Sequence, residues 1–256
     1  MRVLFFAIAV VATTILGAEA CPYLGYMPGS DVDNPHIARD AESSDKSQEA
    51  GCDGIKTRHG RNLQEDVRFQ GTPKEAIEDA KIWIEEIIDL HDNLGPKFVR
   101  LGFHDCVGGC NGCVNMNNKD NCGLANAIQE LRDLATYYAD QLTRADIWAL
   151  ASLHAADLAQ DNDDAVDYPF DYYGRPTCEE GEMDGPDDPM PSPHLTTDEI
   201  LAYFRSVFNF DDKETVAIMG AHTLGRLSEG NSGFDGPQGW VPNVNRLDND
   251  FYDLLL

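Results

Sequence analysis

Three side chains suited to acid–base or electrostatic chemistry stand within six residues of the otherwise apolar stretch KFVRLGFHDC. They are Arg100, His104 and Asp105. Arg100 and His104 are four residues apart, so a helix places both on one face, about 5–6 Å apart at Cβ. A charged arginine and a titratable imidazole are costly to bury, which favours a site where charge develops during a reaction. A salt-bridged pair in the core is the alternative.

A second histidine, His222, lies in the stretch MGAHTLGR beside Gly220 and Ala221. Both neighbours are small, and we expect them to let a flat, bulky partner lie close to the helix. Imidazole is the usual axial ligand of haem iron. A lone histidine in a helix is more often a core residue, so this motif alone leaves both interpretations open.

The elements that must position these residues are predicted to be helices. A capping box of Thr72 and Glu75 opens a helix whose apolar spacing continues to the Gly95–Pro96 pair. Further helices are expected over residues 97–106, about 124–140, 143–160, 196–208 and 211–226. A loop rich in Gly, Asn and Cys is expected over 107–121. Since alternating strand patterns are almost absent, the fold class is predicted to be mainly α.

The first twenty residues have the pattern of a cleaved secretory signal peptide. Arg2 precedes an apolar run through Ile15, and Ala18-Glu19-Ala20 suits signal peptidase. The apolar run is short for the alternative, a transmembrane anchor. We expect an irregular N-terminal extension over residues 21–71 and a packed domain over 72–256.

The net charge of the chain limits the classes of partner that it could bind. The net charge is −26, which disfavours binding to nucleic acid or to an anionic membrane. A cationic or neutral partner fits better, although acidity can serve solubility alone.

The seven cysteines all follow the predicted signal, in a compartment where disulfides would persist. Their pairing is left open, and an odd number leaves one thiol unpaired or paired outside the chain. A rival interpretation groups His104 with Cys106, Cys110 and Cys113 as a zinc or iron–sulfur site.

Taken together, RLGFHDC and MGAHTLGR resemble the distal and proximal signatures of the plant, fungal and bacterial haem peroxidase superfamily. The resemblance spans about Thr72 to the C-terminus, and RADIWALAS, YGR, MPSPHLTTDEI and GFDGPQGWVPNVNRLDNDFY resemble family segments in the same order. It implies haem b held between a distal and a proximal helical half. It further implies a secreted enzyme that reduces hydrogen peroxide to water and oxidises a small one-electron donor through an oxoferryl intermediate.

The resemblance assigns roles to four residues around the haem. His222 would bind the iron, and His104 would take a proton from one peroxide oxygen and return it to the other. Arg100 would stabilise negative charge on the departing oxygen. Asn121 would accept a hydrogen bond from His104 and keep its other ring nitrogen basic.

Two aromatic residues point to different branches of the superfamily. Phe103 matches the aromatic residue that lines the distal pocket of secretory members. Trp240 matches the tryptophan that intracellular ascorbate and cytochrome c peroxidases place beneath the proximal histidine. The chain is therefore expected to combine features of both branches.

Metal and disulfide sites are also implied. Asp105, with oxygens from Gly109 and Asn111, matches a distal calcium site, although Asn111 and Cys113 stand where Asp and Ser are usual. Cys106 and Cys110 resemble a short family disulfide. On the proximal side a calcium or potassium ion is implied at Thr223, Asn243 and Asp248.

The chain ends at Leu256, before the buried aspartate that in this family hydrogen-bonds the proximal histidine. We therefore expect a C-terminally incomplete peroxidase domain, with a non-catalytic secreted protein on a truncated scaffold as the alternative function. The sequence leaves open the electron donor and the oligomeric state.

Overall fold

The computed structural model describes residues 68–91, 93–107, 109–160, 169–179, 190–192, 194–226 and 239–255. Across these residues the chain forms helices and two isolated bridges, with no strand, which confirms the mainly α prediction. No helix among them is long and apolar enough to cross a membrane. The predicted signal peptide and most of the predicted N-terminal extension lie outside the described residues.

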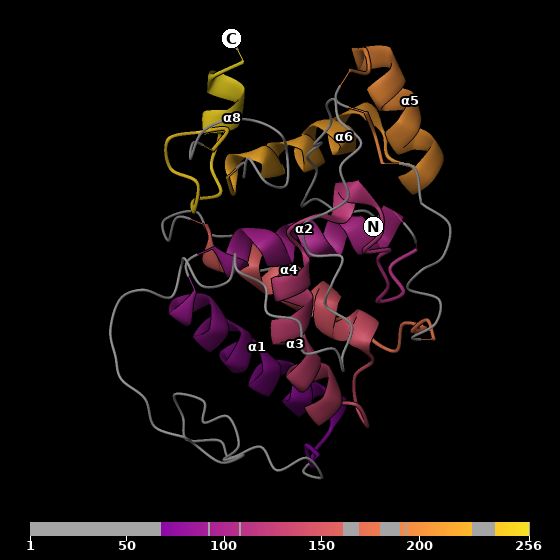
Figure 1. Ribbon diagram of the computed structural model, residues 1–256, viewed down its shortest axis with the longest axis vertical. Helices are drawn as coiled ribbons and strands as arrows, with labels where there is room; N and C mark the ends of the chain where they lie inside the picture. The colour runs from indigo at the N-terminus through magenta and orange to yellow at the C-terminus, as the bar shows by residue number, and fades with distance from the viewer. Residues whose placement is uncertain are drawn as a thin grey trace.

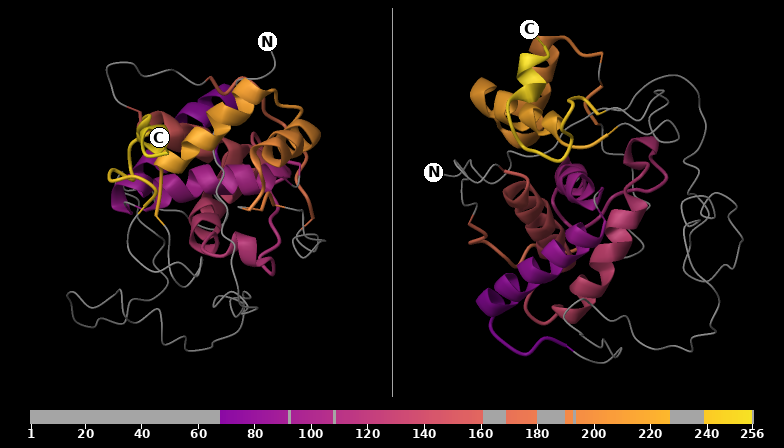
Figure 2. Two further views of the ribbon diagram at one scale, coloured as in Figure 1. Left: turned by 90° about the horizontal axis from the view of Figure 1, so that it is seen from above. Right: turned by 90° about the vertical axis from the view of Figure 1, so that its left-hand side faces the viewer.

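The helices form two groups. The first comprises α1 (Pro73–Leu90), α2 (Leu94–Val107), α3 (Ala125–Tyr137) and α4 (Arg144–Leu158), with the short turn η3 (Lys119–Asn121). The second comprises α5 (Thr197–Phe208), α6 (Asp212–Met219), η5 (Gly220–Thr223) and α8 (Asp250–Asp253). In Figures 1 and 2, α2 lies between the rest of the first group and the second group. His104 and His222 thus come from different groups.

Four helices begin at capping boxes, in which the cap side chain and the third helical residue satisfy each other's backbone amides. These pairs are Thr72 with Glu75, Thr143 with Asp146, Thr196 with Glu199, and Asp211 with Glu214. Each pair lies within four residues of sequence. The starting points of α1, α4, α5 and α6 are therefore determined locally.

Two predicted helix ends are wrong. α1 ends at Leu90, and the Gly95–Pro96 pair lies instead in the first turn of α2, where proline loses no intrahelical hydrogen bond. The helix expected to carry His222 through Arg226 stops at Met219 and continues only as η5. Apolar spacing extends across these boundaries, which is why periodicity alone did not find them.

The boundary of the packed domain also differs slightly from the expected start at Thr72. The Phe69 amide donates to the Tyr137 carbonyl at 2.9 Å. The Phe69 ring packs against Tyr138 with 5.3 Å between centroids. The packed part of the chain therefore already includes residues just before α1.

Close contact between α2 and α4 fixes the helix that carries His104. A Cβ atom placed on Gly102 would lie 2.3 Å from the Ser152 hydroxyl oxygen, so only glycine allows this approach. The Ser152 hydroxyl in turn donates to the Val99 carbonyl at 3.3 Å. Around this crossing the fully buried side chains include Phe98, Leu101 and Trp148.

We predict that Gly102→Ala lowers the free energy of unfolding by about 2 kcal/mol, because the methyl group overpacks the crossing. Gly95→Ala is the matched control, since its Cβ would meet only Ile88 at an ordinary 3.7 Å. That change should alter stability by less than about 1 kcal/mol. Urea unfolding of both variants measures the difference. Adding Ser152→Gly should restore the Gly102→Ala variant, and equal losses at both glycines would contradict the packing argument.

Candidate functional site

The distal histidine is held in one orientation by an amide. His104 is 5 % exposed, and its Nδ1 lies 2.7 Å from Oδ1 of Asn121. The Asn121 amide nitrogen donates to the Asn115 carbonyl at 2.7 Å, so Oδ1 must face the imidazole and accept its Nδ1 proton. Nε2 is then the unprotonated nitrogen. Burial, reinforced by the nearby Arg100 charge, lowers the pKa of His104 to about 3, so the ring is neutral at ordinary pH.

Arg100 is anchored to the same turn as Asn121. Its guanidinium donates to the carbonyls of Asp120 at 2.6 Å and Cys122 at 2.8 Å. Burial lowers the pKa of Arg100 to about 10, which still leaves it charged at neutral pH. The structure therefore places Arg100, His104 and Asn121 together at the meeting of α2 and η3. The resemblance to the superfamily implied this grouping.

Phe103 lies on α2 between His104 and α5. Its ring centroid is 5.9 Å from that of His104 and 5.7 Å from that of Phe208. The ring is buried and belongs to the aromatic cluster formed with Phe204 and Phe208. This contact joins the two helical groups next to the distal histidine.

The proximal histidine has its Nδ1 bound to the backbone. His222 is 5 % exposed, and its Nδ1 donates to the Met219 carbonyl at 2.7 Å. Burial lowers the pKa of His222 to about 4, so the ring is neutral and Nε2 is the unprotonated nitrogen. A neutral imidazole with its other nitrogen hydrogen-bonded is the form that binds metals.

Aromatic rings hold the His222 ring in place. Trp240 meets it edge to face at 5.4 Å between centroids, in agreement with the placement that the resemblance implied. Phe251 of α8 stacks on it at 4.7 Å and 15°. Sequence reasoning missed Phe251, although it lies within the DNDFY segment that carried part of the resemblance. It also missed the Met219 carbonyl, which no side-chain pattern could reveal.

Gly220 does not serve the purpose expected for it. A Cβ atom there would lie 3.3 Å from the Tyr252 ring, so Tyr252 occupies the space beside it. The Tyr252 hydroxyl donates to the Val216 carbonyl. The small residue thus lets α8 approach α6, and a flat partner beside Gly220 is not what the structure places there.

Asp105 turns away from the distal histidine, as its position one residue further along the helix predicts. Its side chain is 1 % exposed, and one carboxylate oxygen accepts the amides of Gly112 at 2.7 Å and Cys113 at 3.0 Å. Burial raises the pKa of Asp105 to about 7, although these backbone hydrogen bonds act in the opposite direction. Asn111 lies in this loop, while Gly109 is exposed.

The cysteines of this loop are paired with other cysteines. Cys106 is bonded to Cys110 and Cys113 to Cys178, and Cys122 is also disulfide-bonded. The described part of the chain contains no group of three or more His, Cys, Asp or Glu residues that could hold a metal ion. The alternative zinc or iron–sulfur site at His104, Cys106, Cys110 and Cys113 is therefore wrong, because its thiolates are consumed by disulfides.

Only part of the implied proximal cation site comes together. The Thr223 hydroxyl, which is fully buried, donates to Asp248 at 2.8 Å and lies 3.3 Å from the Arg246 carbonyl. The Arg246 guanidinium lies 3.5 Å from the other Asp248 oxygen. Asn243 is exposed. The Asp248 carboxylate is thus already paired with a hydroxyl and a guanidinium, so a cation here stays a prediction.

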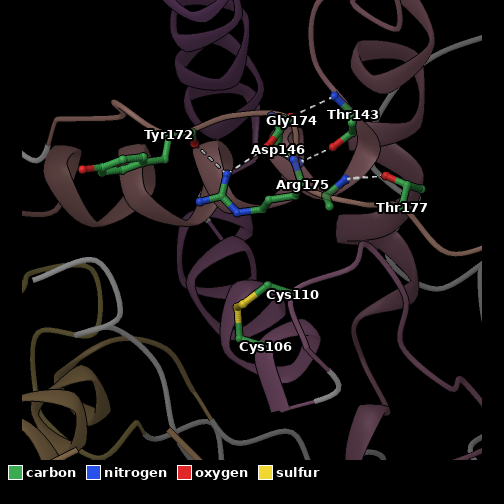
Figure 3. Close-up of polar contacts among 9 residues, drawn as sticks. Cys106, Cys110, Thr143, Asp146, Tyr172, Gly174, Arg175 and Thr177 are labelled. Carbon is green, nitrogen blue, oxygen red and sulfur yellow. Dashed lines mark hydrogen bonds and ion pairs between the residues drawn. A yellow bond between two sulfur atoms is a disulfide. The ribbon is translucent and has the colours of Figure 1, made fainter. Parts of the chain in front are cut away.

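A buried carboxylate organises the segment that precedes the proximal group. Asp146, at the start of α4, accepts the amides of Gly174 at 2.7 Å and Arg175 at 3.2 Å. It also pairs with the Arg175 guanidinium at 2.9 Å, as Figure 3 shows. The YGR stretch singled out in the sequence therefore packs onto the first turn of α4, where Thr143 also bonds Asp146.

The residues present fit a haem. Two buried neutral imidazoles, from α2 and from η5, each use Nδ1 for a hydrogen bond and leave Nε2 unprotonated. One can ligate iron and the other can accept a proton, with a cationic guanidinium anchored beside it. This is the set of side chains that a haem-dependent peroxide reaction requires.

The chain is similar in sequence to several proteins named as peroxidases. A Yarrowia lipolytica protein provisionally named a heme-binding peroxidase is 32% identical over 181 residues, which cover 64% of this chain and 56% of that protein. A mitochondrial cytochrome c peroxidase of Emericella nidulans is 32% identical, over 63% of this chain and 46% of that protein. A chloroplastic L-ascorbate peroxidase T of Arabidopsis thaliana is 33% identical, over 65% and 43%.

The chain spans about half the length of the curated relatives it matches. A family model described as peroxidase matches residues 80–256. This range contains both histidines, the asparagine and arginine beside the distal one, and the tryptophan beside the proximal one. The chain therefore belongs to the peroxidase family.

Proposed function

We propose that the chain is a haem peroxidase that reduces hydrogen peroxide with electrons from a small-molecule donor. One observation carries the proposal: a buried, neutral His104 whose Nδ1 is bound to Asn121 and whose Nε2 is unprotonated. Arg100 and Asn121 lie beside this imidazole, held by the same turn η3. His104 is arranged as a base, in a chain whose other buried imidazole suits iron ligation.

The chain's own residues divide the work of the reaction. His222 would hold the haem through Nε2, and bound haem supplies the redox chemistry that breaks the peroxide O–O bond. His104 Nε2 takes the proton of one peroxide oxygen and returns it to the other, which leaves as water. The Nδ1–H bond to Asn121 keeps the ring in the required tautomer. Arg100 stabilises negative charge on the leaving oxygen, and two electrons and two protons complete the reduction to two waters.

We propose the class of electron donor mainly from the net charge of the chain. The relatives include proteins named for cytochrome c and for ascorbate, and Trp240 contacts the His222 ring edge to face. The net charge of −26 attracts cationic donors at long range and repels anionic ones, and it leaves the approach of neutral donors unaffected. This supports a neutral phenolic donor over ascorbate, which is an anion at neutral pH.

We predict that the haem-loaded protein shows a Soret band and oxidises guaiacol, a neutral phenol, with hydrogen peroxide faster than it oxidises ascorbate. His104→Leu should keep the Soret band but slow the peroxide reaction by about 10²–10⁴-fold, since the base is lost. His222→Ala should weaken the haem signal itself. Stopped-flow absorbance separates the two effects.

The exposed His194 provides the control, because His194→Leu should leave both measurements unchanged. Absence of a Soret band in the unmutated protein would contradict the proposal and favour a non-catalytic protein on this scaffold. A His104→Leu variant that reacts with peroxide at the original rate would remove His104 from the mechanism.

The proposed histidine states also determine how stability depends on pH. His104 and His222 have folded pKa values of about 3 and about 4, against 6.5 for an exposed histidine. Below pH 6.5 the unfolded chain therefore binds protons that the folded chain does not. Each group then removes up to about 1.4 kcal/mol of stability per pH unit as the pH falls toward its folded pKa.

We predict that between pH 7.5 and pH 5 the His222→Gln variant loses about 2 kcal/mol less stability than the unmutated chain, measured by urea unfolding without added haem. His194→Gln, at an exposed position, should lose as much as the unmutated chain. Equal losses in all three proteins would mean that His222 is not held neutral by burial.

We also propose that the protein is secreted. The signal-like pattern of residues 1–20 supports this, as do disulfides at Cys106–Cys110 and Cys113–Cys178, because such bonds persist in oxidising compartments. We predict that expression in a eukaryotic host yields protein in the medium with an N-terminus near Cys21. N-terminal sequencing checks this. Full-length protein retained inside the cell would contradict it.

A further inference from the structure

The loop between α2 and Val114 is where the resemblance implies a calcium ion bound by Asp105, Gly109 and Asn111. We propose that this loop is locked instead by Arg144 and the Cys113–Cys178 disulfide, and that the lock positions the end of α2 that carries His104. The consequence for His104 rests on the proposed function. The way in which the loop is stabilised does not rest on the proposed function.

Three of the oxygens that the implied calcium site would use, on Asp105 and Asn111, already accept protein hydrogen bonds. Oδ1 of Asp105 accepts the amides of Gly112 and Cys113 at 2.7 and 3.0 Å. Oδ1 of Asn111 lies 3.2 Å from the Cys113 amide, and the Asn111 carbonyl accepts the Cys178 amide at 3.0 Å. Calcium requires six to eight oxygens that face the ion. Here amide protons, with their partial positive charge, already lie against these three oxygens.

An arginine side chain already binds this loop. The Arg144 guanidinium donates to the Gly112 carbonyl at 2.8 Å and to the Cys178 carbonyl at 2.9 Å. One of its nitrogens also lies 3.1 Å from the Cys178 sulfur. Arg144 thus joins a loop carbonyl to a carbonyl of the Cys178 segment, as a bound metal could do, and its charge would repel a calcium ion nearby.

The disulfide connects the loop to a rigid part of the fold. Cys113 and Cys178 are 65 residues apart in sequence. The segment just before Cys178 is fixed to the first turn of α4 through Asp146, Gly174 and Arg175 (Figure 3). The disulfide therefore ties the loop to this segment, and the partly buried Asp146–Arg175 ion pair ties the segment to α4. By contrast, Cys106–Cys110 joins the last turn of α2 to the start of the loop and spans only four positions of sequence, so it does not connect the loop to α4.

The lock affects His104 through Asp105, the next residue in the chain. Asp105 is 1 % exposed, and its carboxylate depends on the Gly112 and Cys113 amides that the lock holds in place. The Cys110 amide also donates to the Asp105 carbonyl at 2.9 Å. Release of Cys113 would free these donors and loosen the last turn of α2, on which the His104 imidazole depends for its distance from Asn121.

The first test is a metal measurement on the full, oxidised chain. After dialysis, elemental analysis should find much less than one calcium per chain, and adding calcium or EDTA should shift Tm by less than about 1 °C. Because a proximal cation at Asp248 stays a prediction, both measurements are repeated on Asp248→Asn. One calcium per chain, or a rise of several degrees on adding calcium, that persists in Asp248→Asn would overturn the proposal, whereas calcium that is lost in this variant belongs to the proximal side and leaves the lock in place.

The second test removes the lock. Cys113→Ser combined with Cys178→Ser should lower Tm by roughly 10 °C. Cys106→Ser combined with Cys110→Ser should lower Tm less, because the Cys106–Cys110 disulfide closes a much shorter loop. In the haem-loaded protein, the first pair should also change the Soret and visible bands, as a displaced distal histidine would. An unchanged Tm and spectrum for the first pair would contradict the lock.

Arg144 is tested by replacement and rescue. Arg144→Met should reproduce part of the loss of Tm and of the spectral change, and Arg144→Lys should recover some of both, because it keeps the charge but not the two-carbonyl geometry. Arg205→Met is the control, since Arg205 forms only an exposed pair with Asp212. If the unmutated protein bound no haem, the proposed function would fail, while the calcium and Tm results would still decide the lock. Equal effects of Arg144→Met and Arg205→Met would overturn the part assigned to Arg144.

Discussion

The close approach of α2 and α4 at Gly102 is the constraint on which the distal site depends. With the Ser152 hydroxyl where the Gly102 side chain would be, the rotation of α2 about its axis is fixed. Arg100 and His104 then face η3, Phe103 faces the aromatic residues of α5, and Asp105 faces the loop that follows. Helix geometry assigns these four residues to different neighbours, although they stand within six positions of sequence.

The two imidazoles are neutral for the same reason, and each has a neutral hydrogen-bond acceptor in place of a carboxylate. Burial disfavours the charged form of both rings, and each donates its Nδ1 proton to a neutral oxygen. For His104 an amide acceptor suits a base, because it fixes the tautomer without making Nε2 excessively basic. For His222 the Met219 carbonyl pulls less on the Nδ1 proton than a carboxylate would. With the contacts that the described residues give it, His222 would therefore act as an ordinary imidazole ligand with little imidazolate character.

Sequence reasoning succeeded where the cause is local or repeats with a helical period. Capping boxes such as Thr196 with Glu199 determine helix starts within four residues, and the i, i+4 spacing of Arg100 and His104 was enough to place both on one face. Sequence reasoning failed where a contact joins segments that are far apart in the sequence. Nothing local indicates that Tyr252 fills the space beside Gly220, that Phe251 stacks on His222, or that Cys178 pairs with Cys113.

The loop after His104 illustrates how a substitution in a motif changes its physical interpretation. Cysteine in place of the usual serine weakened the expectation of calcium from sequence alone, but its meaning depended on a partner 65 residues away. Once that bond and Arg144 are known, the same loop has amide donors bound to Asp105 and a guanidinium bound to its Gly112 carbonyl. A metal site requires oxygens that are free to turn toward an ion, and a loop that uses those oxygens for internal hydrogen bonds has a different source of rigidity. That rigidity then depends on the redox state of the surroundings, whereas a calcium site depends on the ion concentration.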